Sequence, residues 1–200
     1  MPKLEWKGGA LLAPLPVVLV SSALPDEKPN VATVAWCGIT CTQPPKVYIS
    51  LRPSRHSHEI ISKTGEFVLN PVPGSLIRTA DTCGVFTGRK VDKFEKCHLT
   101  PEPAFKVSCP SVAECPLSLE CCVTDVISLG THDMFLADVV AVAVSPDLVD
   151  DKNALHLERA GLAAFAHGEY FELGRRIGSF GFSVRKKTGK HSHGRSSGTK

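Results

Sequence analysis

The chain has 200 residues, of which 42% are hydrophobic and 22% charged, a balance that excludes intrinsic disorder and fibrous repeats. Its formal net charge is +3, but residues 184–200 contain six basic and no acidic side chains, so the preceding body is mildly acidic. A nucleic-acid partner is therefore not expected, because such proteins present a basic folded surface. We expect one domain over residues 1–183, followed by a basic flexible tail over 184–200.

The chain also lacks the sequence features of membrane and exported proteins. No apolar segment reaches the roughly 18–20 residues that a membrane span requires. Residues 11–24 are apolar but have no basic leader and are interrupted by prolines. A cytoplasmic location without membrane association is expected.

Eight cysteines could indicate disulfides, zinc or an iron–sulfur cluster. However, no C-x-x-C pair is present, and the short spacings typical of metal sites are missing. In a reducing compartment the thiols should be reduced and act as small buried apolar residues. No metal site is predicted.

The first half of the chain reads as strands with two helices. A helix is predicted over residues 55–64, with Ser54 as its N-cap and Gly65 as its stop, and a second helix over 76–83. Runs of β-branched residues predict strands over 15–23, 31–41, 46–51 and 67–70.

The second half begins with a loop-rich stretch over residues 84–114. Two long strands over 117–129 and 134–144 then form a predicted hairpin, and short helices or turns are expected over 150–159 and 170–177. Strands dominate and pair locally, which favours a mainly β protein, a β-barrel with peripheral helices, over a doubly wound parallel sheet. Neither a G-x-G-x-x-G nor a P-loop motif is present.

One face of the strand over residues 31–41 could bind a ligand. Side chains alternate along a strand, so Asn30, Trp36 and Thr40 should share a face, with Gly38 allowing close approach to the backbone. The distance from Asn30 to Trp36, roughly 20 Å in an extended strand, suits an elongated ligand. The alternative is an exposed tryptophan with ordinary polar neighbours.

The start of the helix at residue 55 could bind an anion. Arg52, Ser54, Arg55 and Ser57 crowd this helix N-terminus, where free N–H groups and the helix dipole favour negative charge. The alternative is a capped helix with a solvated basic surface.

Several stretches, in order, resemble landmarks of one family, the flavin reductase-like, FMN-binding split-barrel family, and flavoredoxin-like proteins in particular. The resemblance covers about residues 10–183. Its landmarks are NVATVAWCGITCTQPP (30–45), VYISLRPSRHSHEII (47–61), FVLN (67–70), VDKF (91–94), GTHDMFLADVV (130–140) and YFELG (170–174).

The resemblance implies a split β-barrel that binds FMN as a homodimer, with each site near the subunit interface. Ser57 would hold the phosphate, with Arg52, Ser54 and Arg55 near it; many relatives have threonine where this chain has Ser57. Lys93 and His132 would lie near the polar edge of the flavin. The positions implied to contact FMN are Asn30, Trp36, Ser57, Lys93, His132 and Phe165.

The leading function is then an NAD(P)H-dependent flavin or ferric reductase, with NADH or NADPH as the electron donor. The resemblance also allows an electron carrier whose FMN is reduced by a redox protein partner. Two further alternatives are a small-molecule binding protein without redox activity and a cysteine-based metal or thiol protein. No side chain selects one nicotinamide nucleotide over the other.

Overall fold

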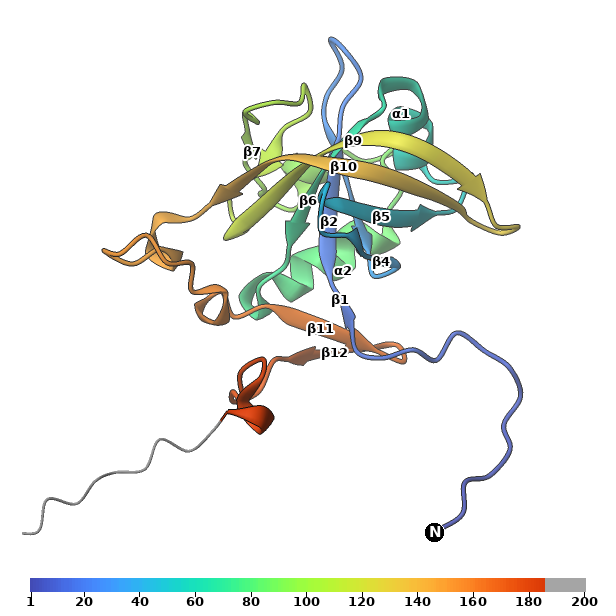
Figure 1. The fold of residues 1–200 in the computed structure, drawn as a ribbon. Coiled ribbons are helices and arrows are strands. Elements are labelled where there is room, and N and C mark those ends of the chain that lie inside the picture. Colours follow the sequence, from blue (N-terminus) through green and yellow to red (C-terminus); the bar gives the residue numbers. More distant parts are fainter. Residues whose placement is uncertain (186–200) are drawn as a thin grey trace, which may run out of the picture.

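The computed structural model describes residues 1–185, so most of the predicted tail over 184–200 lies outside the described residues. Its body is a seven-stranded antiparallel sheet in the order β3-β2-β6-β9-β10-β5-β4, curled into a barrel (Figure 1). The strands are β2 (Val18–Ser22), β3 (Asn30–Val34), β4 (Cys37–Cys41), β5 (Lys46–Leu51), β6 (Glu66–Pro71), β9 (Leu117–Ser128) and β10 (Asp133–Val144).

The two edges of this sheet are joined by only two residues. The prediction of one strand over 31–41 is wrong, because the chain leaves β3 at Ala35 and Trp36 and enters β4 at the opposite edge. The Trp36 carbonyl accepts a hydrogen bond from the Ser50 amide at 2.8 Å, which fixes the break against β5. We call this junction the seam of the barrel.

Smaller sheets flank the barrel. β1 (Leu15–Pro16), β11 (Ala163–Ala166) and β12 (Glu169–Glu172) form a three-stranded sheet, drawn below the barrel in Figure 1. The prediction of a helix or turn over 170–177 is thus wrong at its start: His167 and Gly168 both have positive φ and make a tight turn that pairs Phe165 with Tyr170. A further pair joins β7 (Pro101–Glu102) and β8 (Ser111–Val112).

Three α-helices lie at the periphery, α1 (His56–Thr64), α2 (Ile77–Val85) and α3 (Lys93–Lys96). The α1 helix is confirmed, and it ends at Gly65, whose left-handed φ of 70° lets its amide bond the Ile61 carbonyl. Its N-cap residue is Arg55, without a side-chain cap, so the assignment of Ser54 as N-cap is wrong. Short 3-10 turns occur at Gly74–Leu76, Pro146–Leu148, Leu157–Arg159 and Phe182–Val184.

The α3 helix lies within the stretch predicted to be loop-rich. The Asp92 side chain accepts the Glu95 amide and so caps this single turn. Both α2 and α3 lie against β3, which places the segment between them over the edge of the sheet.

Two cores hold these layers together. Phe67, Phe135 and Ile49 fill the barrel, and Leu19 and Val31 pack beneath α2 and α3 on the other face. Each such side chain contributes about 1.5–3 kcal/mol on burial. The mainly β fold with peripheral helices is confirmed. Within residues 1–185, no helix is both long and apolar enough to cross a membrane.

All eight cysteines are free thiols. Their predicted burial is confirmed for five of them, whereas Cys41, Cys97 and Cys122 are partly exposed. In the part of the chain that the structure describes, no group of three or more His, Cys, Asp or Glu side chains is placed to hold a metal ion.

Candidate functional site

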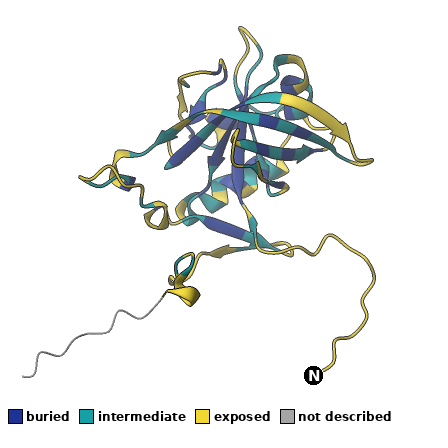
Figure 2. Cartoon of the chain, in the orientation of Figure 1, coloured by how far each residue is buried: buried dark blue, intermediate teal, exposed yellow. Residues whose placement is uncertain are grey.

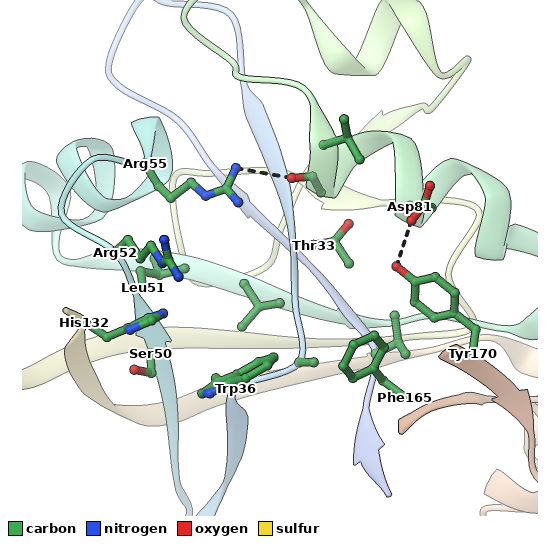
Figure 3. Close-up of a pocket in the computed structure, with 15 residues that line it drawn as sticks. Thr33, Trp36, Ser50, Leu51, Arg52, Arg55, Asp81, His132, Phe165 and Tyr170 are labelled. Carbon is green, nitrogen blue, oxygen red and sulfur yellow. Dashed lines mark hydrogen bonds between the residues drawn. The ribbon is translucent and has the colours of Figure 1, made fainter. Parts of the chain in front are cut away.

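A cavity of about 480 Å³ opens at the seam of the barrel (Figure 3). This volume lies in the range of roughly 300–1,000 Å³ that small-molecule sites occupy. Its walls come from β3, β5, α2, β11, β12, the turn before α1 and the β9–β10 turn, so it exists only because these elements converge at the seam. The lining residues are Val17, Thr33, Val34, Ala35, Trp36, Ser50, Leu51, Arg52, Arg55, Asp81, Gly84, Val85, His132, Phe165 and Tyr170.

One side of the cavity is aromatic. The ring centroids of Trp36 and Phe165 lie 6.3 Å apart, and those of Phe165 and Tyr170 5.5 Å apart. The Tyr170 hydroxyl donates to Asp81 at 3.1 Å, and burial followed by this carboxylate raises the pKa of Tyr170. Trp36 is 44% exposed, which leaves ring surface free to pack against a flat ligand.

The opposite side holds two arginines and a histidine. Arg52, Arg55 and His132 gather there, away from Asp81 and Tyr170 (Figure 3). The Arg55 guanidinium donates to the Gly84 carbonyl at 3.2 Å, and no carboxylate within residues 1–185 forms an ion pair with Arg52 or Arg55. Uncompensated guanidinium groups beside the start of α1 suit an anionic ligand.

A second, smaller cavity of about 30 Å³ adjoins the first. The two share Thr33, Leu51, Arg55 and Gly84 in their walls. In the smaller one the Asn30 amide donates to the Ser57 hydroxyl at 2.7 Å, although 27 positions separate these residues. Both side chains are almost fully buried, so this polar pair is held against β3 and α1.

Lys93 supplies a buried cation to the small cavity. Its Nζ donates to the Val31 and Cys83 carbonyls at 2.7 and 2.8 Å, and the side chain is only 4% exposed. Burial lowers the pKa of Lys93 to about 8. An ammonium group has three protons, so one remains for a ligand.

The segment over residues 84–92, between α2 and α3, covers the small cavity. Gly88 lies so close to the Asn30 side chain that a Cβ at this position would collide with the Asn30 amide oxygen. Arg89 fastens the segment to α1 through Glu59 at 2.7 Å. The space beneath has room for one or two water molecules, so a phosphate group would enter only if this segment moved.

Eight of the ten residues predicted from the sequence line these two cavities. Thr40 and Ser54 line neither and are exposed, Thr40 because the seam and the bulge after Ile39 interrupt the alternation that placed it beside Trp36. Lys93 and His132, which the resemblance places together, line different cavities. The large cavity contains Trp36, Arg52, Arg55, His132 and Phe165, and the small one Asn30, Arg55, Ser57 and Lys93.

Sequence reasoning missed Asp81 and Tyr170. Tyr170 stands in the last landmark stretch, YFELG, but its pairing through β12 to β11 is what turns its ring into the cavity. Gly38 was expected to leave room for a ligand, yet the Tyr48 ring of the neighbouring strand occupies that space.

Comparison with known proteins agrees with this architecture. An uncharacterized protein of Archaeoglobus fulgidus is 31% identical over 154 residues, 77% of this chain and 86% of that one. The flavoredoxin of Desulfovibrio vulgaris superposes with a TM-score of 0.86 at 28% identity, over 92% of this chain and all of that one. An FMN reductase (NADH), RutF, of Stutzerimonas stutzeri is 24% identical over 126 residues, 63% of this chain and 70% of that one.

A flavin reductase of Shewanella frigidimarina with a split barrel domain superposes with a TM-score of 0.75 at 21% identity, over 83% of this chain and 85% of that one. The split-barrel fold implied by the sequence is thereby confirmed. The sequence model of the flavin reductase like domain matches residues 11–174, which include the whole seam and every residue that lines the two cavities. The chain therefore belongs to the flavin reductase-like family.

Proposed function

We propose that this chain binds FMN at the seam and acts as an NAD(P)H-dependent oxidoreductase that reduces a flavin or a ferric chelate. The observation that carries the proposal is the polarity of the paired cavities. An aromatic wall lies at one side, two arginines and a histidine lie at the other, and a buried polar pocket adjoins the side with the arginines. FMN has the same division into a flat ring system and an anionic phosphate.

The residues present fit this cofactor in distinct ways. Trp36 and Phe165 would pack against the ring system, and His132 would donate to its polar edge, where hydrogen-bond donors favour the anionic reduced state. Arg52 and Arg55 would neutralise the phosphate. Lys93 lies in the small cavity with Ser57 and apart from His132, so we assign it to the phosphate and not to the polar edge of the flavin, with its third proton adding a buried charge-assisted bond. The bound flavin would supply the chemistry of accepting a hydride and passing on its electrons.

The choice of an enzyme over a carrier rests on the similarity to the FMN reductase (NADH) of Stutzerimonas stutzeri. The 44% exposure of Trp36 supports it, because a second flat molecule could approach the aromatic wall from solvent. The opposing candidate, an electron carrier reduced by a partner protein, is supported by the fit to the flavoredoxin.

An anaerobic absorbance spectrum, recorded on the protein with FMN before and after addition of NADH or NADPH, separates these functions. Flavin bands that bleach with either nucleotide support the reductase and rank the donors. Bands that persist with both but bleach on photoreduction support the carrier. Failure of the protein to take up FMN contradicts the proposal. The remaining candidate functions are then a non-redox small-molecule binding protein and a cysteine-based metal or thiol protein.

We also propose that the chain forms a homodimer. An extended arm precedes β1 and a short segment that ends in a 3-10 turn follows β12 (Figure 1); the first is exposed along its length and the second is mostly exposed (Figure 2). We call both of them arms. They hold large apolar side chains that a monomer would leave in water, namely Leu4, Trp6, Leu11 and Leu12 in the first arm and Ile177, Phe180 and Phe182 in the second. Burial of these side chains against a second copy would remove them from water, which supports a protein–protein interface at the arms.

A further inference from the structure

Two thiols outside the proposed flavin contacts lie close together beside the small cavity. The Sγ atoms of Cys83, near the end of α2, and Cys97, directly after α3, are 3.6 Å apart. Cys83 is fully buried in the core beneath α2, whereas Cys97 is partly exposed. No other pair of cysteine side chains in residues 1–185 is in hydrogen-bond contact.

These two cysteines bracket the segment that covers the small cavity. Between them lie Gly84 and Gly88, which line that cavity, and Lys93, whose Nζ bonds the Cys83 carbonyl. The segment is otherwise held by reversible contacts, including the Arg89–Glu59 ion pair and the Lys96 ammonium over the Phe86 ring at 4.8 Å. A covalent link at its base would restrict the movement that admits or releases an anionic group.

We propose that Cys83 and Cys97 form a reversible disulfide that clamps residues 84–96 over the small cavity and slows exchange of the bound flavin. The effect on exchange rests on the proposed FMN site, whereas the disulfide itself does not.

The chemistry needs a two-electron oxidant, for which a low-molecular-weight disulfide serves. The Cys97 thiolate attacks that disulfide, forming a mixed disulfide and releasing one small thiol. Cys83 then loses its proton and attacks the Cys97 sulfur, which releases the second small thiol. Two S–H bonds break, one protein S–S bond forms, and the small disulfide gains two electrons and two protons.

The exposure and pKa of the two thiols differ as this order of reaction steps requires. Cys97 is the one that solvent reaches, so it meets the oxidant first. Burial, followed by the nearby Cys97, raises the pKa of Cys83 to about 12, so this thiol carries little thiolate and does not start the reaction. Its place 3.6 Å from the Cys97 sulfur is what lets it resolve the mixed disulfide. The sulfurs must approach from 3.6 Å to a bond length of about 2.05 Å, which is a small closure.

The test compares the FMN-loaded protein in oxidised glutathione and in dithiothreitol. Thiol titration and peptide mapping should show that two thiols are lost reversibly and that one cross-link joins Cys83 to Cys97. The FMN dissociation rate should fall by about tenfold or more on oxidation and recover on reduction, because the clamped segment no longer opens freely. Cys97→Ser should show neither change, and Cys122→Ser, which alters another partly exposed thiol, should behave as the parent.

A cross-link to Cys115, which packs in the same core as Cys83, or the absence of any cross-link would overturn the proposed pair. A Cys83–Cys97 cross-link with an unchanged FMN dissociation rate would overturn the clamp. If the protein takes up no FMN, the proposed function fails, while the thiol measurements still decide whether the disulfide forms.

Discussion

At the scale of single residues, Ser57 and Ser54 provide a matched pair. Both are serines at the start of α1, but Ser57 is buried in the small cavity and Ser54 is exposed outside both cavities. Ser57→Ala should weaken FMN binding by about 1–2 kcal/mol, because a donor to the phosphate is lost. Fluorescence titration with FMN measures this change. Ser54→Ala should bind as the parent; equal affinities for all three proteins would remove Ser57 from the site.

Lys93 gives the site a pH dependence. The pKa of Lys93 is lowered to about 8, so the side chain is mostly charged at neutral pH and loses its proton as the pH rises through this value. Binding of anionic FMN should therefore weaken by about tenfold between about pH 7 and about pH 9.5, because the attraction to the ammonium disappears. Dissociation constants measured across this range check the prediction. Lys93→Met should bind more weakly at pH 7 and lack most of the dependence; a parallel slope in that variant would assign the titration to another group.

The sequence could identify a site residue when the features that mark it lie close to it in the chain. Arg52, Arg55 and Ser57 were found because they stand beside one predictable helix start, and α1 is indicated by its own apolar spacing and by Gly65. The contact between Asn30 and Ser57, by contrast, joins positions far apart in the chain, and only the folded sheet brings them within 2.7 Å. Asp81 was missed because nothing in its own neighbourhood indicates that Tyr170 will face it.

At the scale of elements, the segment over residues 84–92 depends on the small size of Gly88. Gly88→Ala would push a methyl group into the Asn30 side chain, so the segment or Asn30 must shift. We expect a loss of about 1–3 kcal/mol in the free energy of unfolding, together with weaker FMN binding. Urea unfolding and an FMN titration measure the two effects. Gly174→Ala, at a position with open space around it, is the control; identical behaviour of the two variants would show that Gly88 is not tightly packed.

The elements also show why some of the fold could not be predicted. The β9–β10 hairpin was found because its strands are long and its turn is local. The break between β3 and β4 was missed because Ala35 and Trp36 fit an extended strand, and what interrupts them is a bond from Ser50 on another strand. The strand β12 was missed for the same reason, since it is defined by pairing with β11.

At the scale of the whole molecule, the apolar arms should determine the oligomeric state. Replacing Trp6 and Leu12 by lysine places two charges where we expect contacts with a second copy, and burying unpaired charge there is unfavourable. The dimer dissociation constant should rise by about tenfold or more, as measured by sedimentation velocity. Lys3 and Lys7, already charged in the same arm, offer control positions for Ala substitutions. A parent protein that sediments as a monomer would contradict the proposal.

The seam has one further consequence for the barrel as a whole. β3 and β4 each have a free edge, and the two-residue link at Ala35 and Trp36 is all that covalently joins them. A flavin bound across this gap would contact both β3 and β4. It would join the two edges in place of the interstrand hydrogen bonds that a closed barrel would have there. Amide hydrogen exchange should then slow along both strands when FMN binds, while the β9–β10 hairpin keeps its rate. Bound FMN would thus form part of the barrel wall that encloses its own binding site.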